Sequence, residues 1–272
     1  MSNVVALITG ASSGLGAVYA RQLAAQGYNL VLVARREERL AALAAELEER
    51  HGVSAQALAA DLSTPDGIER VEERIARLEA VDMLVNNAGF GFPGKFAESD
   101  LARHLDMIHV HVTASVRLCR AALPGMIARR RGRIINVASL SAFVPAGHAT
   151  YTATKTYLVA FSETLQIELY GTGVRVQALC PGFTYTEFHD TPELAPSFDR
   201  AQIPRLMWMP AEKVVALSLK ALERGRVAYI PGFLNRLLAA LARNRLASLL
   251  FVAALKNQAS PDSDDTVGKI EE

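Results

Sequence analysis

The chain has 272 residues, half of them hydrophobic and 21% charged, so it is long enough to bury a sizeable core. Its formal net charge is +1, with acids and bases interspersed, which gives no electrostatic reason to expect a nucleic-acid partner. The two cysteines, Cys119 and Cys180, lack metal or disulfide spacing and are expected to be reduced core residues. No metal site is predicted. Because no basic region precedes the first strand-like segment, a signal peptide is not expected and a cytoplasmic location is predicted.

Short β-branched runs alternate with segments of helical period along the chain. Helices are predicted over Leu15–Gln26, from Glu37 onward, and around Ile68 to Leu78, where apolar residues recur every three or four positions. The predicted strands are Val4–Ile8, Leu30–Val33, Ala55–Ala59, Met83–Val85, Arg133–Val137, Val174–Ala178 and Val227–Ile230. This alternation predicts βαβ units, and hence an α/β Rossmann-type, doubly wound parallel sheet covered by helices on both faces.

The alternation continues without an internal boundary, so residues 1–232 are predicted to form a single domain. Residues 183–210 are rich in Pro, Thr and aromatics and have no clean period, which is typical of a substrate loop or lid. Residues 233–257 are predicted to form an amphipathic helical extension, and the polar residues 258–272 a disordered tail.

A glycine-rich turn follows the first strand, where Thr9–Gly16 reads Thr-Gly-Ala-Ser-Ser-Gly-Leu-Gly and a helix begins within it. Glycines at this place let backbone amides approach a pyrophosphate, and the helix N-terminus offers free N–H groups and partial positive charge. The alternative is a tight strand-to-helix turn that binds nothing. The residues predicted to bind a dinucleotide here are Gly10, Ser12, Ser13, Gly14, Leu15 and Gly16.

Further motifs follow in order: Asn86-Asn87-Ala88-Gly89, Ser139, Tyr151-x-x-x-Lys155, and Pro181-Gly182-Phe183-Thr184. With the glycine spacing Gly-x-x-x-Gly-x-Gly, they make the chain resemble the classical short-chain dehydrogenase/reductase family from about Val4 to Ile230. The resemblance implies a nicotinamide-dependent oxidoreductase acting on a carbonyl or secondary alcohol. It also implies a homodimer or homotetramer.

The end of the second predicted strand selects the cofactor. An acidic residue there binds the ribose 2′-hydroxyl of NAD(H), whereas arginine favours the 2′-phosphate of NADP(H). This chain has Arg35 and Arg36 and no acid before Glu37, so NADP(H) is predicted rather than NAD(H). By resemblance to NADP-preferring relatives Arg35 is the better placed. The alternative is that both arginines only begin a solvated helix.

Other cofactor contacts are implied by the resemblance. Asp61 and Leu62 resemble the pair that contacts adenine, although Asp61 also suits a helix cap. Asn87, Ala88 and Gly89 are expected to line the ribose and brace the central strands. Pro181, Gly182 and Thr184 belong to the segment that holds the nicotinamide carboxamide, with Thr184 as the hydrogen-bonding residue.

Carbonyl reduction requires a proton on oxygen as well as hydride on carbon. Tyr151 and Lys155 are four residues apart and therefore share a helix face, where an ammonium is expected to lower the pKa of the phenol. Ser139 ends a predicted strand, where its hydroxyl can hydrogen-bond the substrate oxygen. The resemblance assigns Tyr151 as acid/base, Lys155 as modulator and nicotinamide-ribose ligand, and Ser139 as substrate orienter.

His111 departs from the family pattern, because relatives carry there an asparagine that supports a proton relay leading from the lysine. Histidine can donate and accept through different ring nitrogens, so a substituted relay is one interpretation. Altered pH dependence, weakened catalysis, and a packed histidine without a catalytic role are the others.

Aromatic residues after the motifs predict an apolar pocket: Phe90, Phe92, Phe143, Phe188 and Trp208, with His148, Met207 and Met209. The helical extension, residues 233–256, is interrupted by arginines too often for a transmembrane span. A packed or interface helix is favoured there over peripheral membrane contact. The main alternative function is a cofactor-binding regulatory protein with weak or lost catalysis; an extended-branch epimerase is disfavoured by the glycine spacing.

Overall fold

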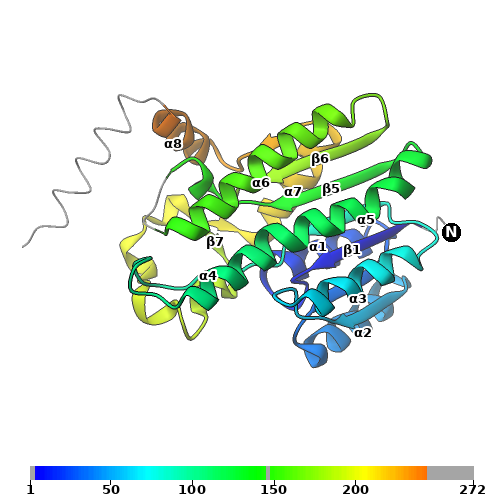
Figure 1. Cartoon of the computed structure of the whole chain (residues 1–272), viewed down its shortest axis with the longest axis horizontal. Coiled ribbons are helices and arrows are strands. Elements are labelled where there is room, and N and C mark those ends of the chain that lie inside the picture. Colours follow the sequence, from blue (N-terminus) through cyan, green and yellow to red (C-terminus); the bar gives the residue numbers. More distant parts are fainter. Residues whose placement is uncertain (1–3, 145–147, 244–272) are drawn as a thin grey trace, which may run out of the picture.

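The computed structural model describes residues 4–144 and 148–243. Seven parallel strands form one sheet in the order β3-β2-β1-β4-β5-β6-β9 (Figure 1). Their bounds are β1 Val5–Thr9, β2 Asn29–Ala34, β3 Ala55–Ala59, β4 Met83–Asn86, β5 Gly132–Val137, β6 Val174–Leu179 and β9 Ala228–Tyr229. A separate parallel pair joins β7 Thr184–Tyr185 to β8 Met209–Pro210.

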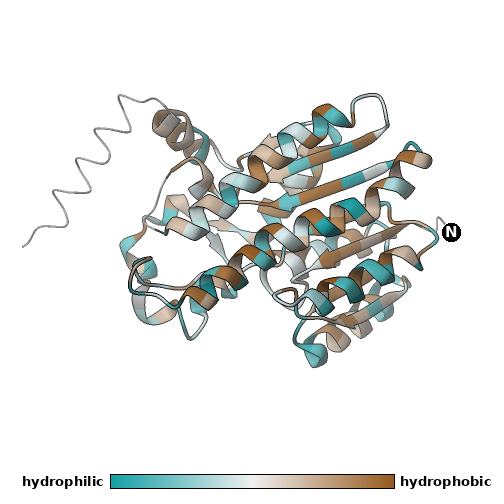
Figure 2. Ribbon diagram, viewed as in Figure 1, coloured by the Kyte–Doolittle hydropathy of each residue, from teal (hydrophilic) through white to brown (hydrophobic). Residues whose placement is uncertain are grey.

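Helices cover both faces of the sheet. They are α1 Gly14–Ala24, α2 Glu37–His51, α3 Pro65–Ala76, α4 Leu101–Ile108, α5 Ala114–Ala128, α6 Ala149–Glu168, α7 Ala211–Glu223 and α8 Phe233–Arg243. One core packs α1, α2 and α7 against the sheet, and a second packs α3, α5 and α6 against its other face. In Figure 2 strand β1 is largely hydrophobic, and the helices that face the viewer carry hydrophobic and hydrophilic residues interspersed.

Local sequence explains where the helices begin and end. The Thr64 hydroxyl accepts a hydrogen bond from Gly67 N–H at 3.1 Å, and Pro65 follows as the first helical residue, so α3 begins there. Helix α2 ends at His51, and Gly52 follows it with a left-handed φ of 63°, a conformation that commonly terminates helices. The predicted fold is confirmed, and each of the seven predicted strands lies within one residue of an observed one at either end.

The carboxyl ends of the strands carry the 183–210 segment, α4 and α8, at the left of Figure 1. The strand order reverses between β1 and β4, and in open parallel sheets a ligand binds in the crevice at this switch point. The 183–210 segment contains β7, β8 and four short 3₁₀ turns: Glu187–Asp190, Ala195–Ser197, Arg200–Gln202 and Arg205–Met207.

Helix α8 covers the first part of the predicted 233–257 extension; the remainder and the predicted 258–272 tail lie outside the described residues. No helix within 4–144 and 148–243 combines the length and the apolar character that crossing a bilayer requires.

Candidate active site

The glycine loop connects β1 to the N-terminus of α1. Its N-cap residue, Ser13, makes no side-chain capping bond, so the first N–H groups of α1 are left for another acceptor. Gly16 lies close to both Gly10 and Asn87. A Cβ on Gly16 would lie 2.6 Å from the Asn87 side-chain nitrogen. Only glycine permits this approach between the loop, α1 and the turn after β4. Leu15 packs against the adjacent core.

Arg36 lies over the glycine loop. Its guanidinium donates to the hydroxyl oxygens of Ser12 and Ser13, at 2.9 and 2.7 Å from Nη2. Arg35 is exposed and makes no hydrogen bond or ion pair with the described part of the chain. The structure therefore joins Arg36, Ser12 and Ser13 into one polar group and leaves Arg35 beside it, although Arg35 had been expected to be the better placed.

Two charged residues that sequence reasoning missed adjoin this group. Arg39 donates to the Glu187 carboxylate at 2.9 and 3.2 Å, and Arg36 Nη1 lies 3.6 Å from the same carboxylate. Since Arg39 and Glu187 are 148 positions apart, no local sequence signal indicates this contact.

The turn after β4 is braced rather than open. The Asn87 side chain donates to Thr9 O at 2.9 Å, while the Thr9 hydroxyl accepts from the N–H groups of Asn87 and Ala88. These bonds fix the turn against β1, as the predicted bracing role requires.

Asp61 lies just beyond β3. Its Oδ1 accepts from the N–H and hydroxyl of Ser63 at 3.0 and 2.8 Å, whereas Thr64 caps α3. The helix-cap interpretation thus applies to Thr64 and not to Asp61, whose turn leaves Oδ2 unbonded among the described residues. Leu62 is buried in the core beside α3.

Ser139, Tyr151 and Lys155 lie together at the carboxyl end of β5 and the first turns of α6. The Ser139 hydroxyl lies near enough to the Tyr151 phenol to influence its pKa, and Lys155 Nζ lies 5.7 Å from the centroid of the tyrosine ring. Lys155 is 4% exposed and donates to Val137 O at 2.9 Å. Helical spacing brings tyrosine and lysine to one face, as expected, and β5 supplies the serine.

The electrostatics of this group differ from expectation. Burial raises the pKa of the Tyr151 phenol, and the nearby Ser139 hydroxyl opposes this rise. Burial also lowers the pKa of the Lys155 ammonium to about 8. The expected lowering of the tyrosine pKa by Lys155 is not found in this structure, because the desolvation of the phenol dominates and the ammonium donates to the β5 carbonyl.

His111 lies in a single π-helical turn, His109–Thr113, between α4 and α5. Its Nε2 accepts the Phe90 N–H at 3.1 Å. Its Nδ1 lies 2.9 Å from the Thr154 hydroxyl, which itself donates to Tyr151 O. Nδ1 must therefore carry the proton, and the ring is the neutral tautomer with both nitrogens engaged. Burial, with the Lys155 charge adding to it, lowers the His111 pKa well below its ordinary value.

Gly89 separates His111 from the lysine. A Cβ at Gly89 would lie 2.9 Å from His111 Nε2 and 3.4 Å from Lys155 Nζ, so the three groups are in close contact. The structure thus brings His111 beside the predicted catalytic residues but does not leave it a free nitrogen.

The segment after β6 lies along the same edge. Leu140 N–H donates to Pro181 O at 2.8 Å, which ties this segment to the end of β5. The buried Thr184 hydroxyl donates to Gly182 O at 3.0 Å. Asn235 of α8 packs against Gly182, a contact that sequence reasoning did not foresee.

Aromatic rings surround the tyrosine. His111 and Phe188 lie 5.7 and 6.3 Å from Tyr151 between centroids, and Phe90 lies 6.0 Å from His111. Trp208 is buried one layer further out, in a cluster with Phe183, Tyr185, His189 and Phe198. Phe188 joins this cluster to Tyr151, since its ring lies 5.2 Å from that of His189. Of the predicted pocket residues, the structure places Phe188 beside Tyr151 and Phe90 beside His111, and packs Phe143 against a third core cluster.

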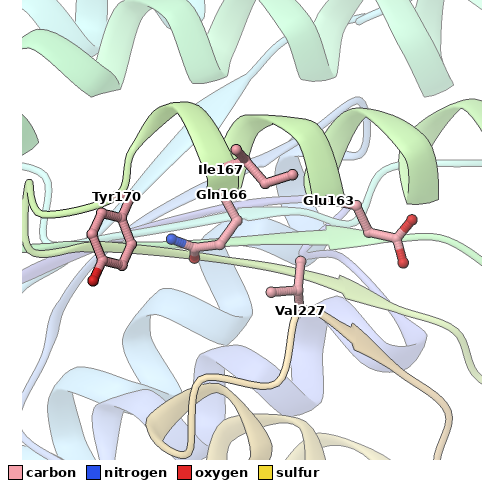
Figure 3. A pocket seen from close by; sticks show the side chains of 5 residues that line it. All are labelled: Glu163, Gln166, Ile167, Tyr170 and Val227. Atoms are coloured by element: carbon pink, nitrogen blue, oxygen red, sulfur yellow. The ribbon is translucent and has the colours of Figure 1, made fainter.

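A surface cavity of about 320 Å³ lies elsewhere on α6 (Figure 3). It is lined by Glu163, Gln166, Ile167, Tyr170 and Val227. At a rise of about 1.5 Å per residue its centre is roughly 20 Å along α6 from Tyr151, so it lies apart from Ser139, Tyr151 and Lys155.

Comparison with known proteins finds similarity along most of the chain. Residues 4–194 match the family described as short chain dehydrogenase. The 17-beta-hydroxysteroid dehydrogenase type 3 of Danio rerio is 34% identical over 230 residues, which cover 82% of this chain and 71% of that protein.

Two solved structures are similar over nearly their whole length. A short-chain dehydrogenase from Sphingobium yanoikuyae in complex with NADPH has a TM-score of 0.79 and 32% identity, covering 98% of this chain and 99% of that one. A bulky-bulky ketone specific alcohol dehydrogenase from Comamonas testosteroni has a TM-score of 0.76 and 29% identity, covering 97% of each chain.

Proposed function

The chain belongs to the short-chain dehydrogenase/reductase family, and from this premise we propose that it transfers hydride between NADP(H) and the carbonyl or secondary alcohol of a bulky, apolar substrate. The observation that carries the proposal is the convergence of Ser139, Tyr151 and Lys155 beside the glycine loop. A phenol close to a hydroxyl and beside a buried ammonium is suited to moving a proton to or from a substrate oxygen.

The residues present fit a nicotinamide dinucleotide. The free N–H groups of α1 and the close approach at Gly16 provide for the pyrophosphate, and Arg36 with Ser12 and Ser13 provides donors for a 2′-phosphate. The crystallised relative that holds NADPH supports the same cofactor. When bound, NADPH supplies the hydride.

Tyr151 then supplies the proton. Its raised pKa keeps the phenol protonated at neutral pH, which suits donation to a carbonyl oxygen in the reducing direction. Ser139 orients that oxygen through its hydroxyl. Lys155, held by Val137 O, positions its ammonium to stabilise the phenolate left behind.

The rings of Phe90, Phe188 and His111 around Tyr151 support an apolar substrate. The bulky-ketone specificity of the Comamonas relative points the same way. A homo-oligomer and a cytoplasmic location stay predictions. The alternative of a regulatory protein without catalysis is disfavoured, because the three catalytic side chains are intact and together.

The proposal is tested by steady-state assay of NADPH and NADH oxidation with a panel of bulky apolar ketones and aldehydes. We expect turnover with NADPH, a lower kcat/KM with NADH, and loss of turnover in Tyr151→Phe, which keeps the ring but removes the proton. Equal kcat/KM for the two cofactors would refute the NADP(H) assignment. Undiminished turnover in Tyr151→Phe would refute the catalytic role of Tyr151.

A further inference from the structure

Three consecutive residues of the 183–210 segment contact three different parts of the site. Thr186 packs beside the glycine loop, where a Cβ on Gly14 would lie 3.5 Å from the threonine Cβ. Glu187 pairs with Arg39 and Arg36. The Phe188 ring lies 6.3 Å from that of Tyr151. A displacement at Glu187 is therefore passed directly to the neighbours of the catalytic tyrosine.

The Glu187 carboxylate and a cofactor 2′-phosphate require the same partner. Arg36 Nη1 lies 3.6 Å from the carboxylate, while its Nη2 binds the serines of the glycine loop. A phosphate bound to this guanidinium would be a second anion beside Glu187, and two like charges at such a distance repel. No other carboxylate within the described ranges pairs with Arg36.

We infer that Glu187 is a specificity-determining residue, a carboxylate that a 2′-phosphate displaces from Arg36, so that binding at the adenosine end loosens the 183–210 segment. The inference rests on the proposed function, because it requires that the arginines receive the 2′-phosphate. On this inference Glu187 lowers the affinity for NADP(H), and Arg39 holds the Glu187 carboxylate at the edge of the site.

The contact is weak enough to be displaced. The side chains of Glu187, Arg36 and Arg39 are 58%, 46% and 51% exposed. An ion pair exposed to this degree changes an equilibrium constant for binding or folding by about two- to five-fold. Removing the Glu187 charge is thus expected to change phosphate affinity within this range.

The test is calorimetric titration of the full chain with 2′,5′-ADP and 5′-AMP, which differ only in the 2′-phosphate. Glu187→Gln removes the charge at nearly constant size. Glu193→Gln is the matched control, since Glu193 lies in the same segment and pairs with Arg103 at 2.5 Å. We expect Glu187→Gln to raise the affinity for 2′,5′-ADP about two- to five-fold relative to 5′-AMP, and Glu193→Gln to leave the ratio unchanged.

Hydrogen–deuterium exchange gives a second readout that requires no turnover. In the wild-type chain 2′,5′-ADP should speed exchange over residues 184–190, whereas 5′-AMP should not. In the Glu187→Gln variant, the exchange rate over residues 184–190 should already be high without ligand. Adding 2′,5′-ADP should not raise it further.

The outcomes separate the two proposals. If wild type prefers 2′,5′-ADP to 5′-AMP but Glu187→Gln leaves the ratio unchanged or lowers it, the inference is overturned and the NADP(H) assignment stands. If exchange over 184–190 does not respond to 2′,5′-ADP, the displacement is overturned. If wild type shows no preference for 2′,5′-ADP, the inference falls together with the proposed cofactor.

Discussion

Lys155 holds an ammonium group in the interior of the molecule, and the protein gives up stability to keep it there. The side chain is 4% exposed, and burial lowers its pKa to about 8 from an ordinary value of 10.5. No carboxylate pairs with it within the described residues; its hydrogen-bond acceptor is the Val137 carbonyl. A buried, incompletely compensated charge of this kind is destabilising and is characteristic of a functional site.

Replacing this lysine by methionine should therefore stabilise the fold while abolishing turnover. A depressed lysine pKa means that, between about pH 8 and 10.5, the unfolded chain binds more protons than the folded one, so wild-type stability rises with pH there. The free energy of unfolding of Lys155→Met should exceed that of the wild type by the full amount below pH 8, and the difference should vanish near pH 10.5. The full difference is at most about 3 kcal/mol, reduced by the cost of leaving the Val137 carbonyl unpaired.

Urea unfolding of the two proteins across this pH range measures the difference. Lys213→Met, which changes the same residue type at an exposed position on α7, is the control and should show no such pH dependence. A destabilised Lys155→Met at pH 7 would contradict the account.

Residue spacing predicts some of this chemistry and not the rest. Tyr151 and Lys155 could be placed on one helix face because four residues make about one turn. Glu187 and Arg39 could not be paired from the sequence, since their contact depends on how a distant segment folds back over α2. The raised pKa of Tyr151 could not be predicted from the sequence either, because it depends on the burial of the phenol.

At the scale of elements, the π-helical turn His109–Thr113 interrupts the helix formed by α4 and α5 and turns His111 inward. Such turns occur frequently at functional sites. Here the turn places the imidazole between the Phe90 loop and Thr154 of α6. His111 thereby links the turn after β4 to the helix that carries Tyr151, and we propose that it positions this tyrosine.

His111→Asn is expected to leave the pH dependence of kcat/KM unchanged in shape between about pH 6.5 and 9, because the neutral imidazole does not titrate there. Its shorter side chain cannot span both partners, so either the Phe90 N–H loses its acceptor or the Thr154 hydroxyl loses its donor, and unfolding stability should fall by about 1–3 kcal/mol. A shift of an apparent pKa by about one unit would show instead that His111 takes part in proton transfer.

The strands were predictable to within a residue because parallel strands buried on both faces are continuous apolar runs between turn signals. The 183–210 segment was not predictable in detail. Its 3₁₀ turns are held by contacts among aromatic side chains such as Phe183, Phe198 and Trp208, which no local period records. The π-helical turn is likewise invisible in the sequence pattern, since it shifts the helix by a single residue.

At the scale of the whole molecule, the strand order gathers residues that are far apart in the sequence. Because β1, β4, β5 and β6 are neighbours and all parallel, the segments that follow them meet at one edge of the sheet. The glycine loop, Gly89, Ser139 and Thr184 each follow one of these strands. The fold thus brings to one edge of the sheet the residues that we propose bind the dinucleotide and transfer the proton.

The central claim, hydride transfer between NADP(H) and a carbonyl at this edge, is tested most directly by isotope transfer. NADPH carrying deuterium on one face of nicotinamide C4 is incubated with the enzyme and a bulky ketone, and the alcohol is examined by mass spectrometry. We predict that the product gains one deuterium on its carbinol carbon from one labelled face and none from the other. Alcohol that carries no deuterium from either face would contradict the account.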